Sequence, residues 1–167
     1  GQGQHIALAL VDAQMAWLIN EGTNYLASGQ PPARRGNAHP NIVPYDVFAA
    51  ADGHVIVAVG NDAQFARFCD ALSLGPLHED PAFATNAARV RNRDALTPRI
   101  GAALADRPMA EIIAALEAVK VPVGPVHGVA EALASDQAQA RGAVVGMAHP
   151  GLGGNPVSLL ANPLKLS

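Results

Sequence analysis

The stretch DVFAAADGHVIVAVGND, residues 46–62, predicts a β-hairpin followed directly by a helix. Two runs rich in β-branched and aromatic residues flank Asp52-Gly53, a pair that favours a tight turn between antiparallel strands. Asn61 then stands where a helix would begin, with Gln64 three residues later as the partner in a capping box. An antiparallel strand pair joined to helices is typical of the α+β class.

Helical spacing of apolar residues continues from this hairpin towards the C-terminus. Three helices are expected, and their apolar stripes are Phe65, Phe68, Cys69 and Leu72; Leu96, Ile100 and Leu104; and Ile112, Ile113, Leu116 and Val119. Residues 121–127 are expected to be extended because the prolines at 122 and 125 exclude a helix. Short helical turns, a strand over residues 143–150 and an extended tail over 156–167 complete an α+β fold.

The N-terminal part combines an apolar run with a second helical pattern. Residues 5–10 are expected to form a short strand directly ahead of a helix, which ends at Ser28-Gly29 before two prolines. The helix carries one apolar stripe, formed by Met15, Leu18, Ile19 and Leu26. The sequence begins without methionine and turns apolar almost at once, which favours an excised piece over a natural start.

The composition is that of a folded chain with no nucleic-acid partner. Of the 167 residues, 50% are hydrophobic and 15% charged, enough for one domain or for a small domain with pieces of another. The net charge of −3 argues against a basic binding face. Basic residues gather only at Arg34-Arg35 and, more loosely, at Arg89, Arg91 and Arg93, a set interpreted as part of a solvated segment.

The cysteine content and the apolar runs bear on the compartment. A single cysteine, Cys69, excludes an internal disulfide and fits a reducing environment. No apolar run approaches the roughly 20 residues that cross a bilayer, and the N-terminal stretch lacks the basic start of a signal peptide. A cytoplasmic protein without a membrane partner is expected.

No set of residues in the sequence points to chemistry by itself. The six histidines are scattered and lack the paired spacing of a metal site, so no metal is expected. Cys69 shares a stripe with Phe65 and Phe68 and is interpreted as a small core residue. The glycines of GLGGNP, residues 151–156, lack the lysine and the helix of a phosphate loop. No acidic residue stands alone in an apolar setting, as a catalytic carboxyl commonly does.

One loop is rich in residues that constrain or free the backbone, and in residues that commonly bind ligands. The stretch RRGNAHPNIVPYDVF, residues 34–48, holds two arginines, a glycine, a histidine and two prolines between the N-terminal helix and the hairpin. Loops of this composition are either turns or working parts of a site.

The order and spacing of several segments resemble the family III CoA-transferases of the CaiB/BaiF type, which include the α-methylacyl-CoA racemases. The segments that carry the resemblance are GQGQHIALALVDAQMAWL, GNAHPNIVPYDVF, DGHVIVAVGND, DPAFATNAARVRNRDAL and the QAQARG turn, so that the likeness spans the chain. One departure is Ala7, where the family commonly has an aspartate. Asp12 matches a helix-start position of the family pattern and not its nucleophile.

The resemblance implies an enzyme that moves coenzyme A between carboxylic acids through a catalytic aspartate. The family fold pairs a large Rossmann-like domain with a small domain, in two interlocked subunits. Residues 1–30 would then be the end of the large-domain strand and the linking helix, residues 31–145 the small domain, and residues 146–167 a return segment. Because the family's catalytic aspartate lies upstream of the matched motif, the chain alone is expected to be inactive.

The resemblance also implies which residues meet the substrate. A small-domain loop of the family that closes over the reacting thioester aligns with Gly36, Asn37, Ala38, His39 and Pro40. Its lack of repeated glycines predicts a stiffer loop, which is either a lid or a plain capping turn. Leu10 aligns with a position that touches CoA in some members.

Three readings of the function therefore stay open. The first is the C-terminal part of a CoA-transferase that uses acyl-CoA and a carboxylic acid as a homodimer, the second is part of a racemase, and the third is a non-catalytic association module. With the large domain removed, the apolar N-terminal stripe would be uncovered, which predicts self-association.

Overall fold

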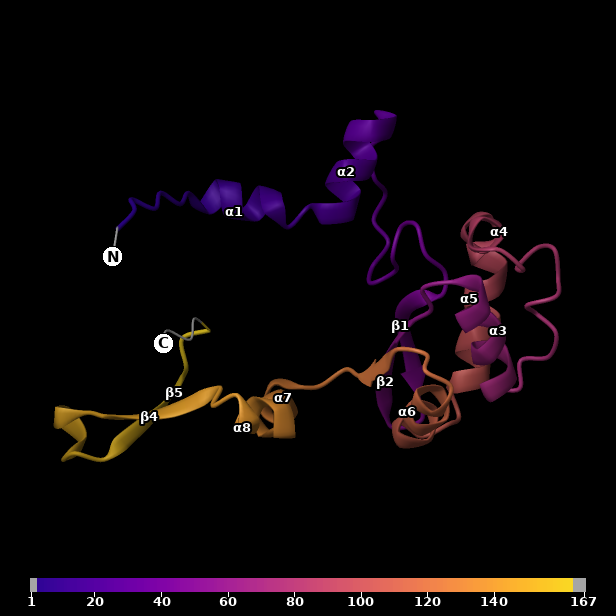
Figure 1. Ribbon diagram of the computed structural model, residues 1–167. Helices are drawn as coiled ribbons and strands as arrows, with labels where there is room; N and C mark the ends of the chain where they lie inside the picture. Colours follow the sequence, from indigo (N-terminus) through magenta and orange to yellow (C-terminus); the bar gives the residue numbers. More distant parts are fainter. Residues whose placement is uncertain (1–2, 164–167) are drawn as a thin grey trace. The chain divides into compact units, whose positions relative to one another are not determined.

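The computed structural model of the protein describes residues 3–163 (Figure 1). The chain divides into two compact units, one up to Pro125 and one from Val126 onward, and each is described by itself. Helices and antiparallel strands occur in both units, and the predicted α+β class is confirmed. Within residues 3–163 no helix is long and apolar enough to cross a membrane.

A three-stranded antiparallel sheet organises the first unit. Its strands are β1 (Tyr45–Ala50), β2 (Gly53–Ala58) and β3 (Val123–Pro125), and β2 lies between the other two. On β2, Val55 and Val57 are fully buried whereas His54 and Ile56 are exposed, the alternation of a sheet with one covered face. The predicted hairpin is confirmed.

The turn of this hairpin differs by one residue from the prediction. Ala50 already pairs with Gly53, so the turn residues are Ala51 and Asp52 and not Asp52-Gly53. The turn is fixed by the start of another helix, because Asp52 Oδ1 accepts the Met109 N–H at 2.8 Å. A Cβ at position 53 would come within 2.8 Å of the Met109 sulfur, so the glycine permits this close approach.

Helices lie beside the sheet of the first unit (Figure 1). They are α3 (Asp62–Ala71), α4 (Asn86–Arg91), α5 (Arg93–Leu104) and α6 (Met109–Ala118). All three apolar stripes predicted from the sequence enter the core, although Ile113 and Val119 are only partly buried. The fully buried members of the stripes are Phe65, Phe68, Cys69, Leu72, Leu96, Ile100, Leu104, Ile112 and Leu116.

The helix cap predicted at Asn61 is confirmed and yields a stability prediction, although the Gln64 side chain bonds the backbone of Gly60 and not that of Asn61, as a capping box requires. Asn61 Oδ1 accepts the Gln64 N–H at 2.9 Å, while Gln64 Oε1 accepts the Gly60 N–H at 2.7 Å. Asn61→Ala removes the acceptor for a helix N–H and should lower the free energy of unfolding by about 1 kcal/mol in urea denaturation. Asn61→Ser keeps a capping oxygen and should remain within a few tenths of the original; equal losses for both would contradict the assignment.

The N-terminal part of the first unit departs from the prediction in two ways. The strand expected over residues 5–10 is wrong, since the described residues ahead of α1 (Leu10–Ala16) form neither a strand nor a helix. A strand requires a neighbour for its backbone hydrogen bonds, and no described strand pairs with this stretch. The expected single helix is also interrupted after Ala16, where α2 (Ile19–Ser28) starts with Ile19 at a φ of 36°. Its predicted end is confirmed, with Gly29 left-handed at a φ of 70°.

The second unit holds two short helices and a β-hairpin. These elements are α7 (Val129–Ala134), α8 (Asp136–Ala140), β4 (Val144–Ala148), the 3₁₀ turn η1 (Pro150–Leu152) and β5 (Pro156–Leu160). β4 and β5 pair antiparallel, which confirms the predicted strand and the extended start of the tail; residues 164–167 of the tail lie outside the described residues.

The predicted domain boundary at residues 145–146 would fall inside β4, whereas the chain divides after Pro125. The assignment of segments to a large and a small domain stays a prediction.

Candidate functional site

The loop over residues 36–40 has an exposed tip and an anchored base. Gly36 adopts a φ of 63°, and a hydrogen bond from the Ala38 N–H to the Arg35 carbonyl at 3.2 Å closes the turn around it. Gly36 and Asn37 are exposed, while Ala38, His39 and Pro40 are half-buried. Only the first two of the five predicted residues therefore stand fully open to a ligand.

His39 is an anchor of this loop. Its ring stacks on that of Tyr45 with the centroids 5.1 Å apart, and its Nδ1 accepts the Asn41 N–H at 3.1 Å. Its Nε2 lies 2.8 Å from the side-chain amide of Asn20, and its backbone N–H donates to the Tyr45 carbonyl at 2.9 Å. Because both ring nitrogens have a partner within the chain, the His39 side chain fixes the loop to α2 and to its own backbone.

Helix α2 holds one side of the loop. The side-chain amides of Asn24 and Asn41 exchange two hydrogen bonds, at 3.0 and 3.3 Å. Arg35 lies 3.5 Å from Glu21 in a partly exposed ion pair, which adds little stability. Between α2 and the loop lies a groove of about 410 Å³ whose lining includes Asn24, Arg35, Pro40 and Asn41.

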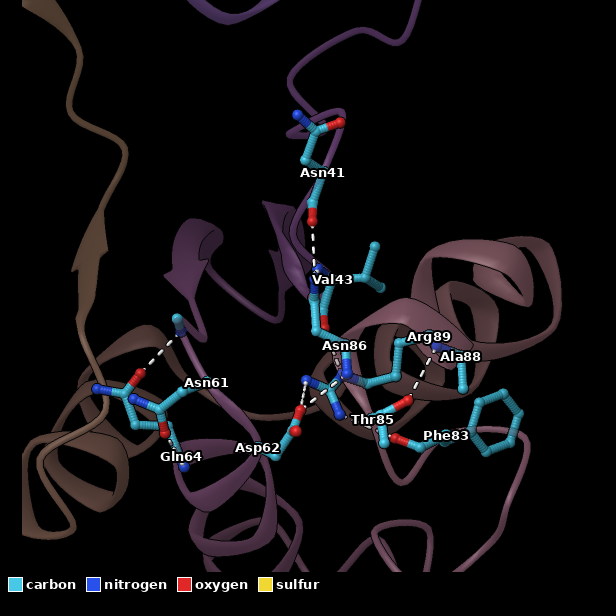
Figure 2. Close-up of polar contacts among 11 residues, drawn as sticks. Asn41, Val43, Asn61, Asp62, Gln64, Phe83, Thr85, Asn86, Ala88 and Arg89 are labelled. Atoms are coloured by element: carbon cyan, nitrogen blue, oxygen red, sulfur yellow. Dashed lines mark hydrogen bonds and ion pairs between the residues drawn. The ribbon is translucent and has the colours of Figure 1, made fainter. Parts of the chain in front are cut away.

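Arg89, on α4, lies beneath the loop and contradicts its interpretation as part of a solvated segment. Its side chain is fully buried, with Nε donating to the Val43 carbonyl at 2.6 Å and Nη1 to the Phe83 carbonyl at 2.9 Å. Nη2 forms an ion pair with Asp62 Oδ1 at 2.8 Å, drawn as a dashed line in Figure 2. The guanidinium carbon stands 4.3 Å from the centre of the Phe65 ring. Charge and hydrogen-bonding capacity are thus satisfied together, which explains how an arginine enters the core.

Two further side chains from the same helical run reach the loop backbone. Asn86 accepts the Val43 N–H at 3.1 Å through Oδ1 and donates to the Asn41 carbonyl at 2.8 Å through Nδ2 (Figure 2). Arg93 Nη2 donates to the carbonyls of His39 and Pro40 at 2.7 and 3.0 Å. These anchors were not predicted from the sequence, although their spacing of i, i+3 and i+7 with Arg89 marks one helix face.

The other predicted or candidate residues take no part in the hydrogen bonds that hold this loop. Leu10 is 87% exposed on α1, and no hydrogen bond or ion pair in the described part of the chain joins that helix to the loop. Cys69 is buried, and burial, with a smaller effect of the Asp70 charge, raises the pKa of its thiol to about 11. The thiol therefore stays protonated near neutral pH, in keeping with a core role. Among residues 3–163, no three potential ligand side chains gather around a metal position.

Known proteins place the chain in a family. The model of CoA-transferase family III matches residues 1–167. The chain belongs to this family. It is 43% identical over 99% of its length to the succinate–glutarate CoA-transferase of Agrobacterium fabrum, and 36% identical over 95% to the acetyl-CoA:oxalate CoA-transferase of Acetobacter aceti. A solved CaiB/BaiF family protein from Brucella suis, 41% identical, matches 99% of the chain with a TM-score of 0.76.

These matches confirm the family resemblance seen in the sequence. The chain covers 42% of the Agrobacterium and Brucella proteins and 41% of the Acetobacter protein, and so spans about two fifths of their length. These relatives are CoA-transferases or CaiB/BaiF family members, which does not favour the racemase alternative.

Proposed function

We propose that the chain is the small-domain part of an acyl-CoA:carboxylate CoA-transferase. Its loop over residues 36–40 would form one wall of the site that binds the thioester. The observation that carries the proposal is the 43% identity to a succinate–glutarate CoA-transferase along 99% of the chain. The substrates would be an acyl-CoA and a carboxylic acid, and the working form a homodimer. The single buried thiol fits the cytoplasm as the location.

The reacting carboxylate would come from chain beyond these 167 residues. No Asp or Glu side chain within residues 3–163 is buried, and only Glu21 and Asp46 are even half-buried. Glu21 faces Arg35 at 3.5 Å, and Asp46 Oδ1 accepts the neighbouring Val47 N–H at 2.7 Å. Neither is free in an apolar setting that would suit a nucleophile, so the chain alone would not transfer CoA.

The loop would act as a fixed wall more than as a moving lid. Ala38, His39 and Pro40 are half-buried, and the loop is tied to α2 and to the α4–α5 run. The exposed Gly36 and Asn37 would then face the acyl-CoA. Leu10 would touch CoA from the separate helix α1.

A two-part transfer assay tests this function. The 167-residue chain, mixed with succinyl-CoA and glutarate, should form no glutaryl-CoA above the enzyme-free rate when products are followed by mass spectrometry. In a chimaera, the chain replaces the matching segment of the Agrobacterium fabrum enzyme, to which it is 43% identical. This chimaera should transfer CoA, because the chain would supply the same wall to a complete site.

Each part can fail separately. Clear turnover by the chain alone would show that it holds its own nucleophile. A chimaera that folds like the unmodified Agrobacterium enzyme, by circular dichroism and sedimentation, yet transfers no CoA would overturn the proposed function.

A further inference from the structure

The geometry points to Asn86 and Arg93 as positioning residues that fix the backbone of residues 39–43 and thereby place the exposed tip, Gly36 and Asn37, at the substrate. This inference rests on the proposed function for its catalytic meaning. The clamp that α4 and α5 form on the loop does not depend on that function, because it is supported by hydrogen bonds within the chain.

The clamp is built from one face of a nearly continuous helical run. α4 ends at Arg91 and α5 begins at Arg93, and positions 86, 89 and 93 fall at i, i+3 and i+7. Side chains on this face donate hydrogen bonds to the backbone carbonyls of four loop residues, which are His39, Pro40, Asn41 and Val43. A single helix face therefore holds almost every peptide carbonyl from 39 to 43.

Arg93 is suited to positioning more than to supporting the core. Its side chain is only partly buried, whereas Arg89 is fully buried. One of its nitrogens holds two successive carbonyls, and hydrogen bonds from a charged donor are about twice as strong as neutral ones. Loss of Arg93 should therefore loosen the loop while the core under Arg89 remains packed.

The opposite side of the loop is held independently by α2. Asn20 meets His39, and Asn24 pairs with Asn41. With both sides of the base fastened, only the tip remains open. A site pre-organised in this way does not have to order the loop when the substrate binds, and its geometry is kept by the supporting residues.

Amide hydrogen exchange on the 167-residue chain tests the clamp directly. Arg93→Gln removes the charged donor, and exchange at Ala38, His39 and Asn41 should become at least about tenfold faster. Arg91→Gln is the matched control, because Arg91 is an exposed arginine at the end of α4. Arg93→Lys retains one charged donor and should restore part of the protection. Equal exchange in Arg93→Gln and Arg91→Gln would overturn the clamp.

Kinetics in the chimaera test what the clamp is for. Arg93→Gln should lower kcat by about tenfold with a smaller change in KM, because a displaced wall weakens positioning in the transition state. Asn86→Ala should have the same kind of effect, while Arg91→Gln should leave both constants unchanged. A role in folding alone would lower the yield of folded enzyme but not the kcat of the folded fraction, and that result would refute positioning.

The two measurements separate the inference from the function on which it rests. If the unsubstituted chimaera transferred no CoA, the proposed function would fail, and hydrogen exchange would still decide whether Arg93 clamps the loop. If the chimaera were active and Arg93→Gln changed exchange but not kcat, the clamp would be structural and the positioning role would be wrong.

Discussion

Replacing Arg89 by methionine is expected to lower the free energy of unfolding by about 2–6 kcal/mol. Methionine fills much of the same volume but leaves the carbonyls of Val43 and Phe83 buried without their donor. An unsatisfied buried acceptor costs about 1–3 kcal/mol, and the substitution leaves two. It also removes the positive charge above the Phe65 ring, 4.3 Å from its centre.

Urea denaturation followed by far-UV circular dichroism measures this loss. Tryptophan fluorescence would not report it, since the single Trp17 is 84% exposed on the N-terminal segment. Arg91→Met, at an exposed position of the same helix, should change stability by less than about 0.5 kcal/mol. Asp62→Asn should cost only about 1–2 kcal/mol, because the amide oxygen can still accept from Arg89. Similar losses for Arg89→Met and Arg91→Met would show that the buried network is not a source of stability.

Most helices and strands of the first unit could be predicted from the sequence, because each depends on a pattern of residues that are close together in the chain. The hairpin, the three apolar stripes and the cap at Asn61 each depend on residues within a few positions of one another. The turn lies one residue earlier than predicted, because the distant residue Met109 donates its backbone N–H to Asp52 and packs closely against Gly53. The strand expected over residues 5–10 was also decided by distant residues. A strand requires a neighbouring strand for its backbone hydrogen bonds, and no described strand pairs with this stretch.

The candidate site was predictable only in part. The resemblance to a known family drew attention to Gly36 and its neighbours, and the structure shows which of these residues are exposed. The anchors were missed because Arg89 acquires its partners across 6, 27 and 46 residues of sequence. Composition and charge pattern cannot indicate that an arginine is buried when every group that compensates it comes from elsewhere in the fold.

Self-association of the 167-residue chain is the other large effect that we expect. Leu26 is 85% exposed, Ile19 68%, Met15 62% and Leu18 54%, and these residues line one apolar groove of about 380 Å³ along the end of α1 and most of α2. Trp17, at 84% exposure, lines a second apolar groove of about 350 Å³ together with Leu10. Soluble monomers rarely leave contiguous apolar surface of this kind uncovered, because its burial releases ordered water.

Sedimentation equilibrium at tens of micromolar should therefore give a mass of at least twice the 17.1 kDa of one chain. The double substitution Met15→Lys and Leu26→Lys places two charges in the groove and should shift the chain to the monomer, because a charge cannot be buried there without a partner. Ala102→Lys with Ala114→Lys adds the same charge at exposed positions of α5 and α6, which separates a local effect from a change in net charge. This control should still associate. A wild-type chain that sediments as a strict monomer, or equal dissociation of the two double variants, would mean that the N-terminal helices do not drive association.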